Sequence, residues 1–354
     1  MPAGPTIEDV ARAAGISTSS ARNFFSRPAV LSAHTHARIQ EAVRATGYVP
    51  RGRAGRLASA ASEFRNLAFE VPRAEDPGVN PFDSQLLVAL LWAARSARFR
   101  LQPFVTDMEP GSRVPYYRQL WARREAAGFL LTDAGYDDER VPYLRQAGIP
   151  FVVLGRLREE RGYCWVDNDN LAGSVMAVCH LVGGGHRRVA YLGWPGRDPV
   201  AERRLEGYRR GLAEAGGLPE LVELQDYGQS AVEPAARLLD RPAGERPTAV
   251  VACCDEFAYD VLRAAAGLGL PVGGGALEGR VAVVGCDDTP LAARTVPTLT
   301  SLRQPIRLLA QRAVDLLAAR VANPGFEAHV LEQPELVVRE TTLPPCADLS
   351  GQYT

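Results

Sequence analysis

The sequence contains no lysine. All 40 basic residues of the 354-residue chain are arginine, and arginine cannot serve as a tunable base or a Schiff-base amine because it stays charged. This absence excludes a P-loop lysine, a pyridoxal-phosphate lysine and an S-x-x-K acylation site. The use of arginine for lysine is typical of a GC-rich coding sequence, and selection for phosphate binding is the alternative.

Other features are also missing. The six cysteines form no C-x-x-C pair, so we expect reduced thiols and neither a disulfide framework nor a zinc site. No apolar run approaches the roughly 18–20 residues that span a bilayer, and the N-terminus lacks the pattern of a secretory signal. G-x-S-x-G and H-E-x-x-H motifs are absent, and the five histidines are scattered. We therefore expect a cytoplasmic protein that is not an enzyme, with no cofactor, no metal and no membrane partner.

The charge is unevenly distributed. The whole chain has a formal net charge of −1, but residues 1–56 carry eight arginines and three acidic residues, so this segment is +5 and the remainder is −6. A basic segment on an acidic body indicates that one part meets a polyanion and the other does not.

The basic segment is predicted to form three short helices. Thr6, Ser17 and Ser32 are N-cap candidates, and Gly15 can end the first helix because it adopts a left-handed conformation easily. A tight turn at residues 15–17 then joins two helices, as in a helix-turn-helix whose second helix enters the major groove. The exposed face of that second helix would present Thr18, Ser19, Arg22 and Asn23. A plain three-helix bundle with a solvated arginine face is the alternative.

Four stretches of this segment resemble the headpiece of LacI-type bacterial transcription regulators. They are residues 6–11 (TIEDVA), 14–17 (AGIS), 31–35 (LSAHT) and 47–50 (GYVP). The resemblance implies that Thr18, Ser19 and Asn23 read bases. It implies phosphate contacts, which fix the register of the protein on DNA, for Thr6, Ser17, Ser32 and Thr35.

Two features depart from the family pattern. Arg22-Asn23 stands where the family has serine and then arginine, so the operator sequence stays open. In the hinge at residues 50–64, the resemblance places Leu57 as a minor-groove wedge with Ala54 beside it, but two glycines weaken this helix. A ligand-binding protein of the same fold that has lost operator reading is therefore the alternative function.

From residue 65 onward, short apolar runs alternate with amphipathic stretches. This alternation predicts an α/β fold with doubly wound parallel sheets, and its length favours two lobes. The expected strands are 67–71, 129–131, 151–154, 189–192, 249–252 and 281–284. The expected helices are 84–97, 171–181, 202–215, 257–266 and 306–319.

Ligands of such sheets bind beyond the carboxyl ends of the strands. Arg156, Asp255 and Asp287 follow predicted strands, and carboxylates with guanidinium groups suit vicinal hydroxyls. Asp255 is equally well explained as a helix N-cap.

The body resembles a periplasmic-binding-protein-type effector domain. The resemblance is carried by residues 80–82 (NPF), 148–154 (GIPFVVL), 166–168 (VDN), 185–190 (GHRRVA), 204–208 (RLEGY), 247–250 (PTAV), 283–288 (VVGCDD) and 299–305 (LTSLRQP). It implies that Phe82 and Asp83 of the first lobe, with Arg204 and Asp287 of the second, line the cleft. Asp83 stands where the family usually has an aromatic residue, Gly155 where an aspartate is common, and Cys254 where it usually has an asparagine. These departures suit a different sugar, an amino sugar or a cationic ligand.

The expected domains are a headpiece (1–49), a hinge (50–64), an effector domain (65–345) and a tail (346–354). Lobe one would hold about 65–165 and 296–325, and lobe two about 166–295 and 326–345. The hypothesis is a homodimeric repressor that binds operator DNA under the control of a small, sugar-like effector. An enzyme acting on sugars is a third possibility, but the expected cleft residues include no nucleophile–base pair.

Overall fold

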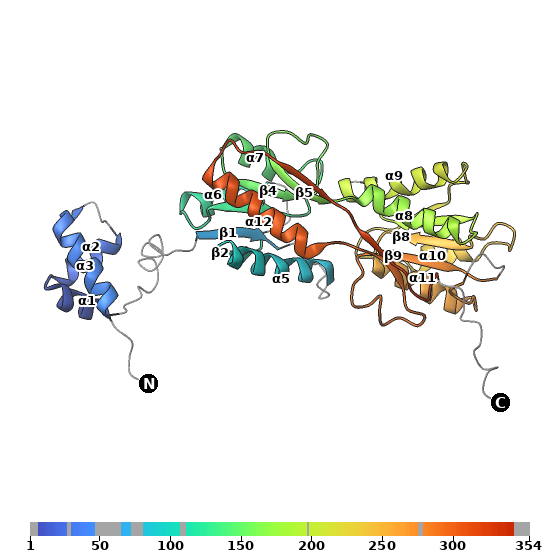
Figure 1. Cartoon of the computed structure of the whole chain (residues 1–354), viewed down its shortest axis with the longest axis horizontal. Coiled ribbons are helices and arrows are strands. Elements are labelled where there is room, and N and C mark those ends of the chain that lie inside the picture. Colours follow the sequence, from blue (N-terminus) through green and yellow to red (C-terminus); the bar gives the residue numbers. More distant parts are fainter. Residues whose placement is uncertain are drawn as a thin grey trace, which may run out of the picture.

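The computed structural model describes residues 6–26, 30–46, 65–71, 81–106, 111–196, 198–274 and 279–342. The expected hinge, with Ala54 and Leu57, lies outside these residues, so its DNA contacts stay predictions. The described chain comprises three N-terminal helices and a larger body (Figure 1).

The N-terminal helices are α1 (Ile7–Ala14), α2 (Thr18–Ser26) and α3 (Ala33–Thr46). Thr6 caps α1 and forms a reciprocal capping box with Asp9. Gly15 ends the helix at φ 61°, which a residue without a Cβ atom adopts easily. Arg38 of α3 donates to the carbonyl of Ala14 at 2.6 Å and fixes this turn against the third helix. The structure confirms the predicted helix, tight turn and helix.

A small apolar core holds the three helices together. Val10, Ala14, Ile39 and Ala42 are buried in it. α2 contributes Ala21, which is fully buried, and Phe24, which packs against this core, so its other side carries the exposed Ser19 and Arg22.

The body contains two six-stranded sheets. Their orders are β11-β5-β4-β3-β1-β2 and β12-β10-β9-β8-β6-β7, and the described pairings are parallel except that of β10 with β12. The first sheet comprises β1 (Arg65–Glu70), β2 (Phe99–Phe104), β3 (Gly128–Leu131), β4 (Phe151–Leu154), β5 (Cys164–Asn168) and β11 (His329–Glu332). The second comprises β6 (Val189–Gly193), β7 (Val222–Leu224), β8 (Ala249–Ala252), β9 (Ala282–Cys286), β10 (Thr300–Arg303) and β12 (Glu335–Val337).

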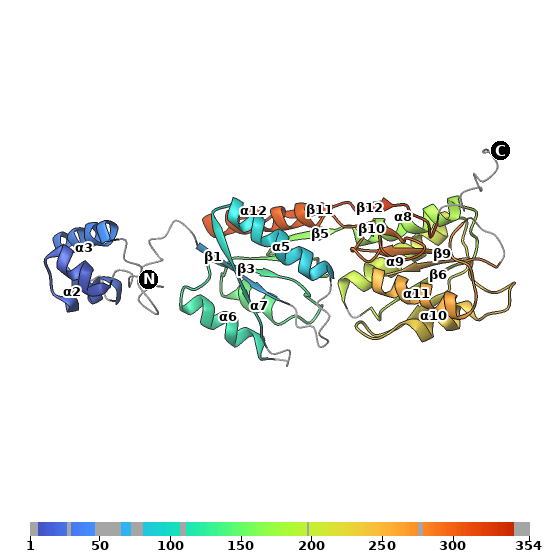
Figure 2. The ribbon, with the colours of Figure 1, turned by 90° about the horizontal axis from the view of Figure 1, so that it is seen from below.

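Helices cover both faces of each sheet, as the predicted doubly wound fold requires (Figure 1 and Figure 2). Those of the first lobe are α5 (Pro81–Ser96), α6 (Arg113–Ala122), α7 (Arg140–Gln146) and α12 (Ile306–Ala322). Those of the second lobe are α8 (Asn170–Gly183), α9 (Pro199–Glu214), α10 (Val232–Leu239) and α11 (Asp255–Gly267). The central strands β3, β4, β6 and β8 are apolar along almost their whole length because helices bury both of their sides.

The chain crosses between the lobes three times: from β5 to α8, from β10 to α12, and from β11 to β12. β10 pairs in the second sheet and β11 in the first. The expected lobe boundaries near residues 296 and 326 were therefore wrong, and the crossings lie at residues 303–306 and 332–335. The physical reason is that the sequence of a short strand does not determine which of two sheets supplies its hydrogen-bonding partner.

These crossings orient the two sheets. β5 ends where the chain enters lobe two, so the carboxyl ends of its parallel partners in the first sheet face lobe two. β10 ends where the chain enters lobe one, so the carboxyl ends of β9, β8 and β6 face lobe one. The ligand-binding ends of both sheets therefore meet between the lobes.

None of the helices in the described ranges is long and apolar enough to cross a membrane.

Candidate functional site

The exposed face of α2 carries the residues expected to read DNA. Ser19 and Arg22 are exposed, and Thr18 and Asn23 are half-buried. The Arg22 guanidinium lies 3.4 Å from the Glu8 carboxylate of α1. Because this ion pair is exposed, it is weak, and DNA can displace it.

The four hydroxyls expected to contact phosphates lie at helix N-termini. The Thr6, Ser17 and Ser32 oxygens each accept a hydrogen bond from a backbone N–H three residues later, at 3.4, 3.1 and 3.2 Å. The Thr35 hydroxyl lies 2.9 Å from that of Ser32. Free N–H groups and the helix dipole make such termini suitable for phosphate, so the geometry fits the expected contacts.

In the body, Arg204 of α9 contacts residues that follow β8 and β9, at the end of lobe two that faces lobe one. Its side chain is 7% exposed. Nε donates to Asn170 Oδ1 at 2.8 Å, Nη1 donates to the Cys253 carbonyl, and Nη2 lies 3.5 Å from Asp287 Oδ1. The guanidinium also lies over the Trp194 ring, 5.6 Å from its centroid. These four contacts fix the position of the Arg204 guanidinium.

Asp287 follows β9 and has an unusual backbone conformation for an aspartate, with φ at 106°. Oδ1 accepts a hydrogen bond from Gln304 and faces Arg204. Within the described chain, Oδ2 accepts no hydrogen bond. This residue therefore has one carboxylate oxygen to offer a ligand.

Asp255 is fully buried at the first position of α11, where Cys254 takes the N-cap position. Its carboxylate accepts from the Thr289 amide at 2.7 Å, from the Thr289 hydroxyl at 2.9 Å and from the Ser301 hydroxyl at 2.6 Å. Burial and the charge of Asp287 raise the pKa of Asp255 to about 7. The helix-cap interpretation was wrong, because Cys254 takes that position, and the expected effector contact of Asp255 stays a prediction.

Lobe one contributes Phe82 and Asp83 from the first turn of α5, and both side chains are half-buried. Partial burial raises the pKa of Asp83 to about 7, and three nearby carboxylates add to this shift. They belong to Asp133, Asp287 and Glu256. Within the described chain, the Asp83 side chain has no hydrogen bond and no ion pair.

Asp133 and Glu256 were not expected at the site. Asp133 is the second residue after β3, and Glu256 lies in the first turn of α11 after β8. Their positions could have identified them, because each lies within a few residues of the end of a predicted strand. Arg140 holds the Asp133 loop by donating to the Thr132 and Asp133 carbonyls at 2.8 and 3.3 Å.

Two further departures from the family pattern have structural explanations. Gly155 ends β4 at φ 124°, a conformation that an aspartate would adopt only with strain. Cys254 is 3% exposed in its N-cap position, so its thiol packs into lobe two.

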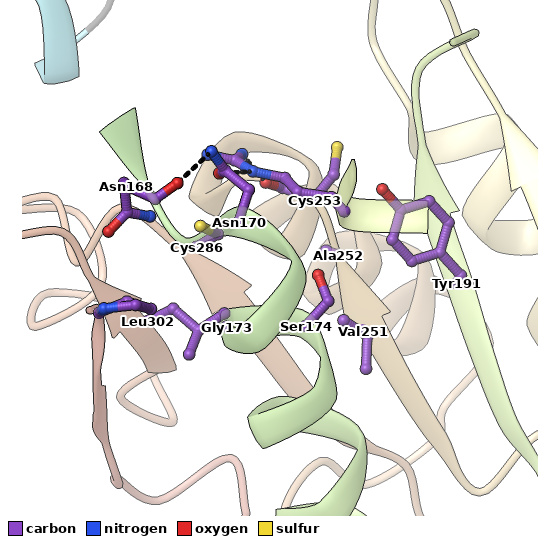
Figure 3. A pocket seen from close by; sticks show the side chains of 12 residues that line it. Asn168, Asn170, Gly173, Ser174, Tyr191, Val251, Ala252, Cys253, Cys286 and Leu302 are labelled. Carbon is purple, nitrogen blue, oxygen red and sulfur yellow. Dashed lines mark hydrogen bonds between the residues drawn. The ribbon is translucent and has the colours of Figure 1, made fainter. Parts of the chain in front are cut away.

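A small cavity of about 10 Å³ lies beside Arg204. Two of its lining residues, Asn168 and Tyr191, are 4% and 1% exposed, and neither Asn168 Oδ1 nor the Tyr191 hydroxyl has a hydrogen-bond partner within the described chain. Figure 3 shows both residues around the cavity, with Asn170 and Cys253 above it. Each is a buried polar group that a water or ligand atom can satisfy.

Direct contacts hold the lobes together beside the cleft. The Tyr136 hydroxyl of lobe one donates to Glu202 of α9, and Arg158 lies 3.7 Å from the same carboxylate. Arg203 of α9 lies 3.5 Å from Glu160 of lobe one. These pairs link the loops after β3 and β4 to the first turns of α9.

In the described residues, no group of three or more histidine, cysteine, aspartate or glutamate side chains could hold a metal ion.

Comparisons with known proteins agree with this architecture. A family model described as a periplasmic binding protein-like domain matches residues 178–342. The HTH-type transcriptional regulator MalR of Streptomyces coelicolor is 30% identical over 349 residues, which cover 95% of this chain and 96% of MalR. A LacI-family regulatory protein from Chloroflexus aggregans has a crystal structure with 31% identity and a TM-score of 0.71, covering 78% of this chain and 98% of that one. The structure of the transcriptional regulator CelR with cellobiose has 27% identity and a TM-score of 0.70, covering 95% and 99%. The chain belongs to the LacI family of helix-turn-helix transcriptional regulators.

Proposed function

We propose that this protein is a homodimeric repressor whose affinity for an operator is set by a small polar effector bound between the two lobes. The observation that carries the proposal is the combination of a helix-turn-helix headpiece with a cleft in which Arg204 and Asp287 are held ready for a ligand. Operator DNA would place this regulator in the cytoplasm.

The exposed side of α5 supports the homodimer. Val88, Leu91 and Trp92 lie on one face of this helix and are 53%, 44% and 68% exposed. Leu308 of the adjacent α12 is 40% exposed and extends the apolar surface. Large apolar side chains clustered on one face indicate a protein interface, and a second copy brings the second headpiece that a pseudo-palindromic operator requires.

Sugar-like ligands suit the Arg204–Asp287 wall, because a guanidinium and a carboxylate can bind neighbouring hydroxyls together. The related CelR was solved with cellobiose. The proposed ligand of this chain is likewise a small polyhydroxylated metabolite.

The lobe contacts supply the mechanism. An effector shifts an equilibrium only if it binds one lobe arrangement more tightly than the other. A ligand that contacts Asp83 of lobe one and Asp287 of lobe two favours the closed arrangement, in which Glu202 and Arg203 meet lobe one. The change in lobe geometry would reach the headpieces through the dimer interface.

Turnover of the ligand is not part of the proposal. The cleft side chains are carboxylates, arginine and aromatic rings, and the described residues place no nucleophile beside a general base there.

Selection of binding sites from random DNA tests the first part, with the full-length protein and a variant that lacks residues 1–64. An enriched palindromic motif with the full chain alone is the expected result. Its affinity should fall steeply as salt rises, because arginine–phosphate contacts release counterions. No enriched motif would favour a ligand-binding protein that has lost operator reading.

A further inference from the structure

The cleft contains more negative charge than Arg204 can neutralise. Asp83 and Asp133 come from lobe one, and Glu256 and Asp287 come from lobe two. Asp133, Glu256 and Asp287 come shortly after β3, β8 and β9, and Asp83 lies in the first turn of the helix that follows β1. The carboxyl ends of these strands face the other lobe, so the topology brings the four carboxylates towards one region.

Nearby arginines do not cancel this excess. Arg140 is committed to Glu70 and Asp138, at 2.7 and 2.6 Å, and Arg113 lies 2.9 Å from Glu70. Asp198, at the start of α9, adds a further negative charge near Asp133, although it accepts hydrogen bonds from the Trp194 indole and from two backbone amides of its helix. Arg158 and Arg203 are paired with glutamates.

The excess carboxylates also keep oxygens without a hydrogen-bond partner within the described chain. Asp83 and Asp133 make no side-chain hydrogen bond or ion pair within the described chain, and Glu256 Oε2 is buried without a hydrogen-bond partner. Independently of the carboxylates, Asn168 Oδ1 is another buried acceptor without a donor in the cavity beside Arg204. Three carboxylates at the facing ends of the lobes, and one amide oxygen in the cavity on the other side of Arg204, thus have acceptor positions open to a donor.

Resting on the proposed function, we propose that the effector is an amino sugar or a similar polyol amine, whose hydroxyls bind Arg204 and Asp287 and whose ammonium group is received by Asp83, Asp133 and Glu256.

An organic cation fits these residues better than a metal ion, because no three of them can chelate one ion within the described chain. An ammonium group donates three hydrogen bonds and can be shared between separated carboxylates. The Tyr227 ring, which is 54% exposed and packs against Trp194 at 5.1 Å, adds an aromatic face to which a cation is attracted. The raised pKa of Asp83 supports this view, since mutual repulsion of the carboxylates disfavours their charged forms and a cation relieves it.

Matched sugar pairs test the proposal on the full-length protein. The probes are glucosamine with glucose, galactosamine with galactose, and the diamino analogue of cellobiose with cellobiose itself. Calorimetry and thermal shift are expected to show at least one amine bound about tenfold or more tightly than its hydroxyl counterpart. Asp83→Asn and Glu256→Gln should each reduce that preference to about threefold or less. Asp240→Asn, which removes an exposed carboxylate at the far end of lobe two, should leave it unchanged.

A proton measurement separates direct contact from a merely structural role. At about pH 6.5, Asp83 is largely protonated, so an incoming ammonium should release up to about one proton from it. Calorimetry in two buffers of different ionisation enthalpy measures this release, which should be absent with neutral sugars and in Asp83→Asn.

The inference is overturned if no amine is preferred over its neutral partner, or if Asp83→Asn leaves a preference intact. A neutral sugar that binds and changes operator affinity would overturn only the charge assignment, and the proposed function would stand. Operator binding that responds to no cleft ligand, although an amine binds, would instead contradict effector control.

Discussion

Arg204 Nη2 and Asp287 Oδ1 lie 3.5 Å apart in the cleft wall of lobe two, and both side chains are 7% exposed. The pair connects α9 to the loop after β9, and Gln304 extends it to the crossing between β10 and α12. The two charges proposed to bind the ligand are therefore linked by a hydrogen bond to a segment that joins the lobes. Under the proposed function, ligand contact and lobe arrangement would act on the same atoms.

Removing the Arg204 charge should destabilise the protein as well as abolish its ligand response. Arg204→Gln leaves Asp287 as an uncompensated, buried carboxylate, which should lower the free energy of unfolding by about 3 kcal/mol. Urea unfolding measures this loss. Operator affinity without effector should stay close to wild type, because the headpiece is untouched.

Arg209→Ala is the matched control on the same helix. Its guanidinium pairs with Glu220 at 2.7 Å, but the side chain is 54% exposed. An exposed pair contributes less than about 1 kcal/mol. If both variants lost the same free energy of unfolding, the Arg204–Asp287 pair would not behave as a buried ion pair.

Asp83 should make the ligand-free protein less stable as the pH rises. Its pKa is about 7 in the folded protein and 3.8 in the absence of shifts, so the folded state binds this proton more tightly. Stability therefore falls between about pH 4 and pH 7 on account of this group. Asp83→Asn removes the effect and should raise the free energy of unfolding by about 1–2 kcal/mol above pH 7, a discounted value because solvent reaches the side chain.

Thermal melts at about pH 5 and about pH 8 check the sign. The gain of Asp83→Asn over wild type should be larger at the higher pH. A loss of stability at the higher pH would mean that the favourable effect of a carboxylate at the start of α5 outweighs the repulsion within the cleft.

The strands that the sequence predicts are the buried ones. Runs such as 151–154 are apolar throughout because helices cover both faces of the sheet. β2 was missed because it is an edge strand with a proline and mostly half-buried or exposed residues. β10 was missed because Thr300 and Ser301 are polar, although both are buried and hydrogen-bonded.

The site was predictable to a similar degree. Arg204 and Asp287 were expected in one wall, and the structure places them in contact. The hydrogen bonds of Asp255 could not be predicted, because nothing in its own stretch of sequence reveals that Thr289 and Ser301 donate to its carboxylate. Asp133 was missed because a loop carboxylate is ordinarily solvated, and only the second lobe makes this one part of a cleft.

Asn23 of α2 should determine sequence preference more than affinity. Its amide can pair with adenine in the major groove, so Asn23→Ala should relax selection at one operator position, with a loss of about 1–3 kcal/mol in discrimination. Binding-site selection with both proteins measures the change. Thr35→Ala is the contrast: as a phosphate contact it should weaken binding to all sequences alike, and a changed motif would contradict that role.

Trp92 should be central to dimerisation. It is 68% exposed beside Val88 and Leu91 of α5, and a second copy that covers this face would bury all three. Trp92→Glu places an unpaired charge in such an interface, which should shift the dimer towards monomer by about a hundredfold or more in dissociation constant. Sedimentation velocity measures the species. Trp121→Glu is the matched control, because this residue lies on α6 across the first sheet and is 37% exposed; this variant should stay dimeric.

The Trp92 variant should also lose operator binding while it keeps its effector site, because the operator is read by two headpieces. A monomer that still binds the full operator at wild-type affinity would refute the link between dimerisation and DNA binding.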